Sequence, residues 1–164
     1  MVAVYNIQTG QYIYINNSLK PLLGYENHEW IDKGVMYVSS KIHPDDLAFI
    51  GEKNQQALKE ADDRINSDSN PIIEFEYRIQ HADGNYKWLK TYGTVFDRDE
   101  LGQVKHVINI SLDITNNKET EEKLLNLADT LEKKVDERTR ELKKSEQKYI
   151  SIFSTLTEGI ALQD

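Results

Sequence analysis

The sequence contains no cysteine among its 164 residues, which excludes a disulfide, a thiolate metal ligand and a cysteine nucleophile. Long hydrophobic runs are also missing, and no stretch approaches the roughly 20 apolar residues that a membrane span needs. Met1 leads directly into VAVYNI, so we expect no signal peptide. We therefore expect a cytoplasmic chain without membrane contact of its own, whether or not flanking segments anchor the parent protein in a membrane.

Positive charge is scarce in the first part of the chain. Residues 1–115 hold 11 Lys and Arg against 17 Asp and Glu, whereas residues 116–150 hold 9 of each kind. An acidic surface repels phosphate backbones, so we predict that nucleic acid is not a partner. The balanced charges of the second segment are typical of a solvated helix with ion pairs along its surface.

Motifs for catalysis and phosphate binding are missing as well. The sequence has neither GxGxxG nor GxxxxGK[ST], and its residues assemble no Ser/His/Asp constellation. His43, Asp45 and Asp46 leave a metal-dependent enzyme open as an alternative, although acids after Pro44 are typical of the start of a helix. We predict no catalytic residue, no metal site and no cofactor in this fragment.

Hydrophobic patterning predicts five strands before residue 116. The run at 72–80 alternates strictly between apolar and polar side chains, and Asp83-Gly84 supplies a hairpin turn to the next strand at 86–97. Residues 25–42 show no clear period. Strands at both ends with helices between them predict an α+β domain, in which one five-stranded antiparallel sheet carries helices on one face. The other expected strands lie at 2–7, 12–15 and 104–115, and the clearest helix lies at 42–61.

Beyond residue 116 the pattern becomes that of a long helix. Apolar residues recur at alternating intervals of four and three, the heptad seam of a coiled coil, with polar Arg138 and Ser145 at two d positions. A single helix cannot bury such a stripe, so we predict a parallel homodimer through this segment. The polar positions favour a marginal coil that can change its packing, and a purely structural linker is the alternative. The seam comprises Leu124, Ala128, Leu131, Val135, Arg138, Leu142 and Tyr149.

The end of the chain is similar to its beginning. GIALQD at 159–164 repeats the apolar-Ala-apolar pattern of MVAVYN at 1–6. After Tyr149 we expect a helix, a turn at Gly159 and the beginning of a strand. The predicted parts are a domain at 1–115, a coiled-coil linker helix at 116–150 and the truncated start of a second such domain at 151–164.

Several of these stretches resemble a PAS domain with a C-terminal PAC motif, as found in bacterial sensor proteins. The resemblance extends from residue 1 to about residue 118. It rests on TGQYIYINNSLKPLLGY, on IHPDDL and above all on EFEYRIQHADGNYKWLKTYGTVFDRDELGQVKHVINISLDIT. Asp113, Ile114 and Thr115 match the family's DIT motif.

The resemblance implies the PAS fold, a signalling role and a joint at Asp113, Ile114 and Thr115 that couples the sheet to the outgoing helix. The linker resembles those that join such sensors to a second PAS domain or a histidine kinase. We therefore expect a downstream PAS domain and an output domain on the same chain, with a histidine kinase as the parent protein. A diguanylate cyclase is the alternative parent, and a ligand-free module for dimerisation or docking is the alternative function.

The resemblance also implies a space for a small ligand between the sheet and the helices. The alternative is that the same side chains simply fill the core. Because cysteine is absent, the cysteinyl-flavin photochemistry of light-sensing PAS relatives is excluded, and any small-molecule ligand stays unidentified. The candidate pocket residues are Tyr14, Leu19, Leu23, Phe49, Phe75 and Tyr77.

Overall fold

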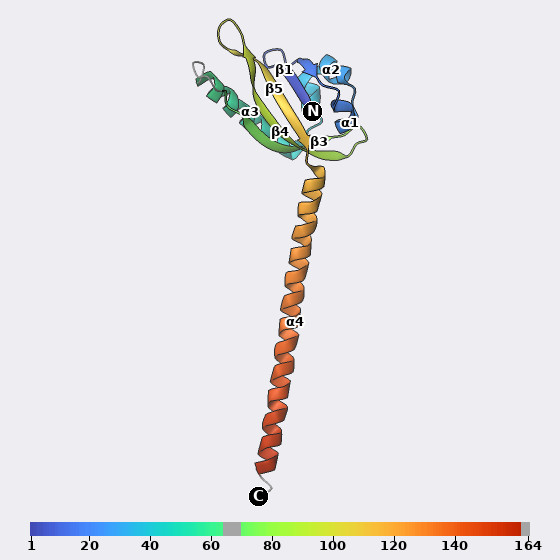
Figure 1. The fold of residues 1–164 in the computed structure, drawn as a ribbon, viewed down its shortest axis with the longest axis vertical. Coiled ribbons are helices and arrows are strands. Elements are labelled where there is room, and N and C mark those ends of the chain that lie inside the picture. Colours follow the sequence, from blue (N-terminus) through green and yellow to red (C-terminus); the bar gives the residue numbers. More distant parts are fainter. Residues whose placement is uncertain (64–69, 162–164) are drawn as a thin grey trace. The chain divides into compact units, whose positions relative to one another are not determined.

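The computed structural model describes residues 1–63 and 70–161. Residues Met1–Lys118 form one compact unit, and the rest of the last helix belongs to a second. Figure 1 follows the elements along the chain from blue to red. The strands are β1 (Val2–Asn6), β2 (Tyr12–Ile15), β3 (Ile73–Gln80), β4 (Tyr86–Arg98) and β5 (Val104–Asp113). The helices are α1 (Leu19–Leu23), α2 (Asn27–Ser39), α3 (Pro44–Asp63) and α4 (Thr115–Ala161).

The strands form one antiparallel sheet in the order β2-β1-β5-β4-β3, so β2 and β3 are its edges. The predicted α+β class with a five-stranded antiparallel sheet is confirmed. Each strand ends within two residues of its predicted limit. Strand β3 follows the alternation that predicts it, because Phe75, Tyr77 and Ile79 are buried while the residues between them are not.

The hydrophobic core lies between the sheet and the first three helices. Helix α1 contributes Leu19 and Leu23, both fully buried, and α2 contributes Trp30. The Trp30 ring packs against Tyr12 and Tyr25 with centroid distances of 5.9 and 6.1 Å, which suits tilted aromatic pairs. From the sheet and α3 the core takes Ala3, Ile15, Ile50, Phe75, Tyr77, Ile79 and Leu89.

Helix α2 is the element that the sequence did not reveal. Its backbone leaves helical geometry at Gly34, where φ is 70° and ψ is −171°, so the helical period is interrupted there. At this kink the Val35 N–H donates to the carbonyl oxygen of Gly10 over 2.7 Å. A Cβ on Gly34 would lie 2.7 Å from that same oxygen, so the kink leaves no room for a side chain.

Edge strand β3 is partly covered by the chain that leads into α3. The His43 N–H donates to the Arg78 carbonyl over 2.9 Å, and the Gln80 N–H donates to the Lys41 carbonyl over 2.8 Å. In addition, the Asp46 carboxylate accepts the backbone N–H of Arg78 over 2.8 Å. Groups that an edge strand would otherwise leave open to another strand are therefore occupied along this stretch.

Helix α4 continues through Gly159 to Ala161, so the predicted turn at Gly159 and strand immediately after it are wrong. A helix satisfies its hydrogen bonds within its own segment, whereas a strand needs a neighbouring strand. Residues 162–164 lie outside the described residues, and the second, truncated domain at 151–164 stays a prediction. Among the described helices, none combines the length and the hydrophobicity that crossing a lipid bilayer requires.

Replacing Gly34 with alanine tests the kink. We expect Gly34→Ala to lower the free energy of unfolding by about 2 kcal/mol, because the new Cβ meets the Gly10 carbonyl and the positive φ is strained. Chemical denaturation measures it. The matched control is Gly51→Ala in α3, where a Cβ meets nothing within 4 Å and should stabilise by about 0.5–1 kcal/mol. Equal effects of the two substitutions would contradict the role of Gly34.

Candidate functional site

The joint between β5 and α4 is built around the backbone of Trp88 in β4. The Ile114 N–H donates to the Trp88 carbonyl over 2.9 Å, and the Trp88 N–H donates to the Thr115 hydroxyl oxygen over 3.0 Å. The Lys118 N–H then donates to the Ile114 carbonyl over 3.0 Å, at the beginning of the helix. The sheet and the helix therefore share one hydrogen-bonded junction.

Asp113 completes this junction. One of its carboxylate oxygens accepts the Thr115 N–H over 2.9 Å and the Thr115 hydroxyl over 2.6 Å, as a cap at a helix start does. The other oxygen accepts from Lys87 Nζ over 2.9 Å. Burial raises the pKa of Asp113, but the hydrogen bonds from Thr115 and Lys87 outweigh it, so the pKa lies below its usual value. The predicted joint residues thus lie in contact.

The structure divides the predicted pocket residues into two groups. Leu19, Leu23, Phe75 and Tyr77 are buried together in the core. Tyr14 and Phe49 are 52% and 45% exposed, so neither belongs to the buried core, and the pocket formed by all six residues stays a prediction.

Two local features explain why Tyr14 and Phe49 are exposed. Strand β2 buries Tyr12 and Ile15 rather than every second residue, and the register of β1 against β2 shifts next to it. In α3 Ile50 faces the core, and Phe49 is turned about 100° away around the helix.

Three hydroxyl groups lie side by side in the core beneath the sheet. Thr91 in β4 and Ser111 in β5 face each other with 2.8 Å between their hydroxyl oxygens, and both residues are 2% exposed. The Tyr77 hydroxyl lies 3.5 Å from that of Thr91. Burial raises the pKa of Tyr77, so this phenol stays protonated. The hydroxyls satisfy one another and give the apolar core a polar spot.

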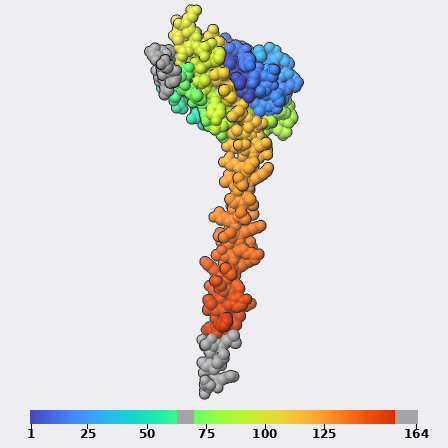
Figure 2. All heavy atoms as spheres, viewed as in Figure 1, coloured from blue at the N-terminus to red at the C-terminus, as the bar shows by residue number. Residues whose placement is uncertain are grey.

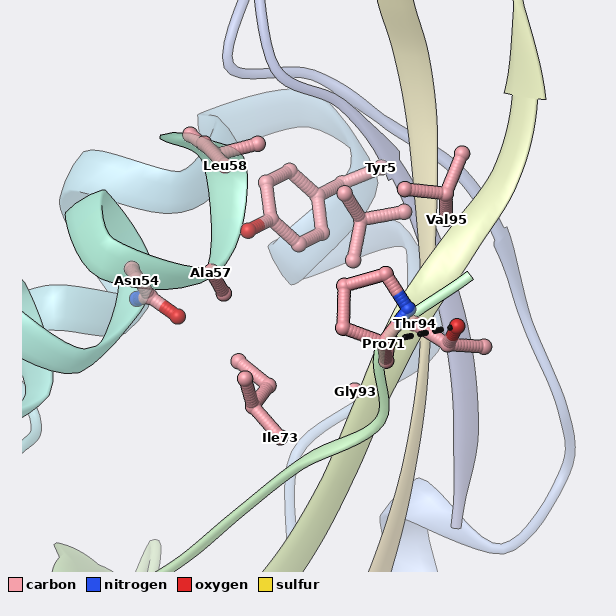
Figure 3. A pocket seen from close by; sticks show the side chains of 10 residues that line it. Tyr5, Asn54, Ala57, Leu58, Pro71, Ile73, Gly93, Thr94 and Val95 are labelled. Atoms are coloured by element: carbon pink, nitrogen blue, oxygen red, sulfur yellow. Dashed lines mark hydrogen bonds between the residues drawn. The ribbon is translucent and has the colours of Figure 1, made fainter. Parts of the chain in front are cut away.

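A cavity of about 30 Å³ lies between α3 and the sheet, and none of the six predicted residues lines it. Tyr5 points into it from β1, Asn54 faces it from α3, and the Thr94 hydroxyl beside it donates to the Pro71 carbonyl over 3.0 Å (Figure 3). The other lining residues are Ala57, Leu58, Ile73, Gly93, Val95 and Val107. A space of this size holds about one water molecule, so a larger ligand needs α3 to move away from the sheet.

One signal in the sequence could have located this cavity. Gly93 stands in the middle of a strand, where glycine often marks a close approach of another group. A Cβ there would lie 2.6 Å from the Asn109 side-chain oxygen and 3.2 Å from Ile73. The other lining residues come from α3, from four strands and from the segment before β3, with no shared motif, so their grouping depends on the fold.

The alternative metal site at the start of α3 is not formed. Asp46 directs both carboxylate oxygens to the guanidinium of Arg78, at 2.7 Å from Nη2 and 3.0 Å from Nε. His43 Nδ1 accepts the Asp45 N–H over 3.3 Å, and the imidazole packs edge-on against Tyr86. Within residues 1–63 and 70–161 no group of three or more His, Asp or Glu side chains is arranged to hold a metal ion.

Helix α4 exposes its predicted seam. All side chains from residue 119 to residue 154 are exposed, and Figure 2 shows this segment in orange to red. Leu131 and Val135 are 53% and 63% exposed, far from the burial that such residues reach in a core. Arg138 pairs with Glu141 of the same helix over 3.1 Å. An apolar stripe of this length is the type of surface that another helix covers.

Comparison with known proteins agrees with this geometry. The family model described as PAS fold matches residues 12–111, which is more than half of the chain. A comparison with curated proteins found no match.

Two solved structures are similar over most of the chain. The N-terminal domain of a diguanylate cyclase with PAS/PAC sensor from Marinobacter aquaeolei is 25% identical, with a TM-score of 0.58, over 71% of this chain and 96% of that one. A sensory box histidine kinase/response regulator from Burkholderia thailandensis is 23% identical, with a TM-score of 0.60, over 80% of this chain and 89% of that one.

The chain belongs to the PAS family. The sheet order, the helices between β2 and β3, and the matched residues all agree with this assignment, so the resemblance to a PAS domain is confirmed. Its fold is shared with these domains of a diguanylate cyclase and of a histidine kinase.

The Thr115 hydroxyl can be tested by isosteric replacement. Thr115→Val removes the acceptor of the Trp88 N–H and should lower the free energy of unfolding by about 1–3 kcal/mol. Exchange of the Trp88 amide, followed by nuclear magnetic resonance, should accelerate at the same time. Thr115→Ser is the control, because it keeps the hydroxyl and should leave the exchange near that of the wild type. Slow Trp88 exchange in the valine variant would refute the bond.

The Asp46–Arg78 pair predicts a pH dependence of stability. The hydrogen bond from Arg78 lowers the pKa of Asp46, partly opposed by burial and helped by His43. A carboxyl with a lowered pKa stabilises the fold above the unfolded value near 3.8 and loses this contribution as pH falls through the folded value.

We therefore expect Asp46→Asn to lower stability by about 2 kcal/mol at pH 7, with a smaller difference from the wild type below about pH 4. Denaturant titrations between pH 7 and pH 2.5 measure this. Asp45→Asn is the control, since this side chain is 74% exposed and 3.5 Å from Arg78, and we expect a loss below about 0.5 kcal/mol. A constant difference between the Asp46 variant and the wild type at all pH values would contradict the pair.

Proposed function

We propose that this PAS module passes a signal from its core, through Asp113, Ile114 and Thr115, to α4, and that α4 pairs with the α4 of a second copy. The observation that carries the proposal is the junction of sheet and helix. Trp88, on a strand that also supplies core residues, bonds both Ile114 and Thr115. A displacement of β4 therefore acts directly on the first turn of α4.

The helix itself supports the pairing. It has 47 residues, and at 1.5 Å per residue its length is about 70 Å. Its exposed apolar residues recur at heptad spacing, and the segment 116–150 has equal numbers of positive and negative charges. In a parallel pair, a second copy of α4 presents the same seam residues in register with those of the first. Such self-complementary pairing is the commonest route to a homodimer.

The first candidate for the signal is the binding of a small molecule. Tyr5 and Asn54 offer a hydroxyl and an amide to a ligand that enters between α3 and the sheet, and the remaining lining is mostly apolar, as in many ligand sites. The small volume of the cavity, about 30 Å³, favours the second candidate: a ligand-free module that only dimerises or docks a partner.

The parent protein is proposed to be a two-component sensor histidine kinase, with a downstream PAS domain and the output domain on the same chain. The similar histidine kinase structure supports this version, and the similar diguanylate cyclase supports a cyclase as the alternative. The module itself contributes sensing and pairing and carries no proposed catalytic residue.

Native mass spectrometry of the chain, purified from its source cells under mild conditions, tests both the pairing through α4 and the binding of a ligand. A dimer with additional bound mass supports ligand sensing, and the mass identifies the compound class. A dimer without additional mass supports the ligand-free module. A monomer at all accessible concentrations would contradict pairing through α4.

Arg138→Leu is expected to tighten the dimer. Arg138 occupies a d position of the seam, and a leucine there adds apolar burial from both copies, which should lower the dimer Kd by about tenfold or more. Sedimentation equilibrium over a concentration series measures the Kd. Arg140→Leu is the matched control, because residue 140 lies at an outer heptad position and should leave the Kd nearly unchanged. Equal effects of both substitutions would refute the seam.

A further inference from the structure

The Trp88 side chain lies on the face of the sheet opposite the core, where two cations contact its ring. Its neighbour Leu89 is fully buried, so the alternation of β4 directs Trp88 to the other face. The Arg78 Cζ atom lies 5.3 Å from the ring centroid, and Lys118 Nζ lies 5.4 Å from it. Both distances are within the range of cation–π attraction.

Each cation is held by its own carboxylate. Asp46 binds the Arg78 guanidinium through both oxygens, with a shortest distance of 2.7 Å, and Glu76 binds Lys118 Nζ over 2.7 Å. Arg78 and Asp46 are 27% and 15% exposed, and Lys118 and Glu76 are 32% and 35% exposed. Two like charges can share one aromatic ring because each is compensated and partly shielded from water.

We call these five residues the Trp88 cluster: Asp46, Glu76, Arg78, Trp88 and Lys118. Its members come from four elements, namely the first turn of α3, the edge strand β3, the strand β4 and the first turn of α4. Helix α3 also forms the wall of the cavity through Asn54, Ala57 and Leu58. The cluster therefore connects the helix that bounds the cavity with the helix that leaves the domain.

We infer that the Trp88 cluster couples the position of α3 to the first turn of α4, with Asp46, Trp88 and Lys118 as positioning residues. When α3 moves, Asp46 draws Arg78 with it and changes the cation contact on one part of the indole. The ring then shifts against Lys118, whose bond to Glu76 and contact with Trp88 hold the beginning of α4. This route is additional to the junction of Asp113 and Thr115, which bonds the backbone of Trp88 rather than its ring.

The use of this coupling for signalling rests on the proposed function, but the coupling itself does not. It requires that a change at Asp46 alters the first turns of α4 and that a change at Lys118 alters the first turns of α3, because coupling free energies are reciprocal. Contacts from Asp46 to Arg78, from Arg78 to the Trp88 ring and from that ring to Lys118 form one continuous route between the two helices.

Amide hydrogen exchange on the full 164-residue chain tests the inference. We expect Asp46→Asn to accelerate exchange at residues 118–122 by about two- to fivefold, and Lys118→Met to accelerate exchange at residues 47–51 by a similar factor. Amides of Tyr92 and Ile110, paired in the centre of the sheet, report global unfolding and provide the reference for both variants. Glu52→Gln in α3 and Lys123→Met in α4 are the controls, and each should leave the distant segment unchanged.

A third substitution distinguishes the cluster from a general loosening of the fold. In a Trp88→Leu background, adding Asp46→Asn should no longer change exchange at residues 118–122. If each variant affects only its own segment, or if the distant effect survives without Trp88, the inference is overturned. A monomeric chain without bound mass that still shows the distant effects would refute the proposed dimeric sensor and leave the coupling intact.

Discussion

The backbone of a single residue, Trp88, fixes where the sheet ends and where the last helix begins. Its carbonyl and its N–H are both taken by residues 114 and 115, immediately after the final strand. Backbone groups cannot be left unpaired at low cost, so the chain must change direction and conformation at this point. The proposed signalling role of α4 depends on this shared junction. A helix joined to the domain by a flexible linker would not be displaced when the domain changes.

The parts of the fold that local rules govern were predictable from the sequence. Strict alternation of apolar and polar residues predicts strand β3, and Pro44 followed by two acidic residues predicts the start of α3. Helix α2 was not predictable, because the kink at Gly34 breaks the period and is held by a carbonyl of a turn that lies 24 positions earlier. The bulge between β1 and β2 had the same effect on Tyr14, whose orientation depends on the register with a neighbouring strand.

The candidate site shows the same division. Asp113 and Thr115 stand next to each other in the sequence, so their mutual hydrogen bonds could be expected from the motif alone. The contact between Glu76 and Lys118 spans 42 positions and arises only after β3, β4 and β5 pair in register. The cavity beneath α3 likewise joins residues from Tyr5 to Val107. Contacts between residues close in the sequence could be predicted, whereas contacts between residues on different strands could be found only from the fold.

Asp46 carries a further consequence through the backbone bond that it accepts. Its carboxylate occupies an N–H on the open side of β3, the edge of the sheet. Protonation of this carboxylate in acid therefore weakens an ion pair and a hydrogen bond to an edge donor at the same time. In acid this part of the edge is therefore less well protected against strand addition by a neighbouring molecule. One carboxylate thus serves both an ion pair and the protection of a sheet edge.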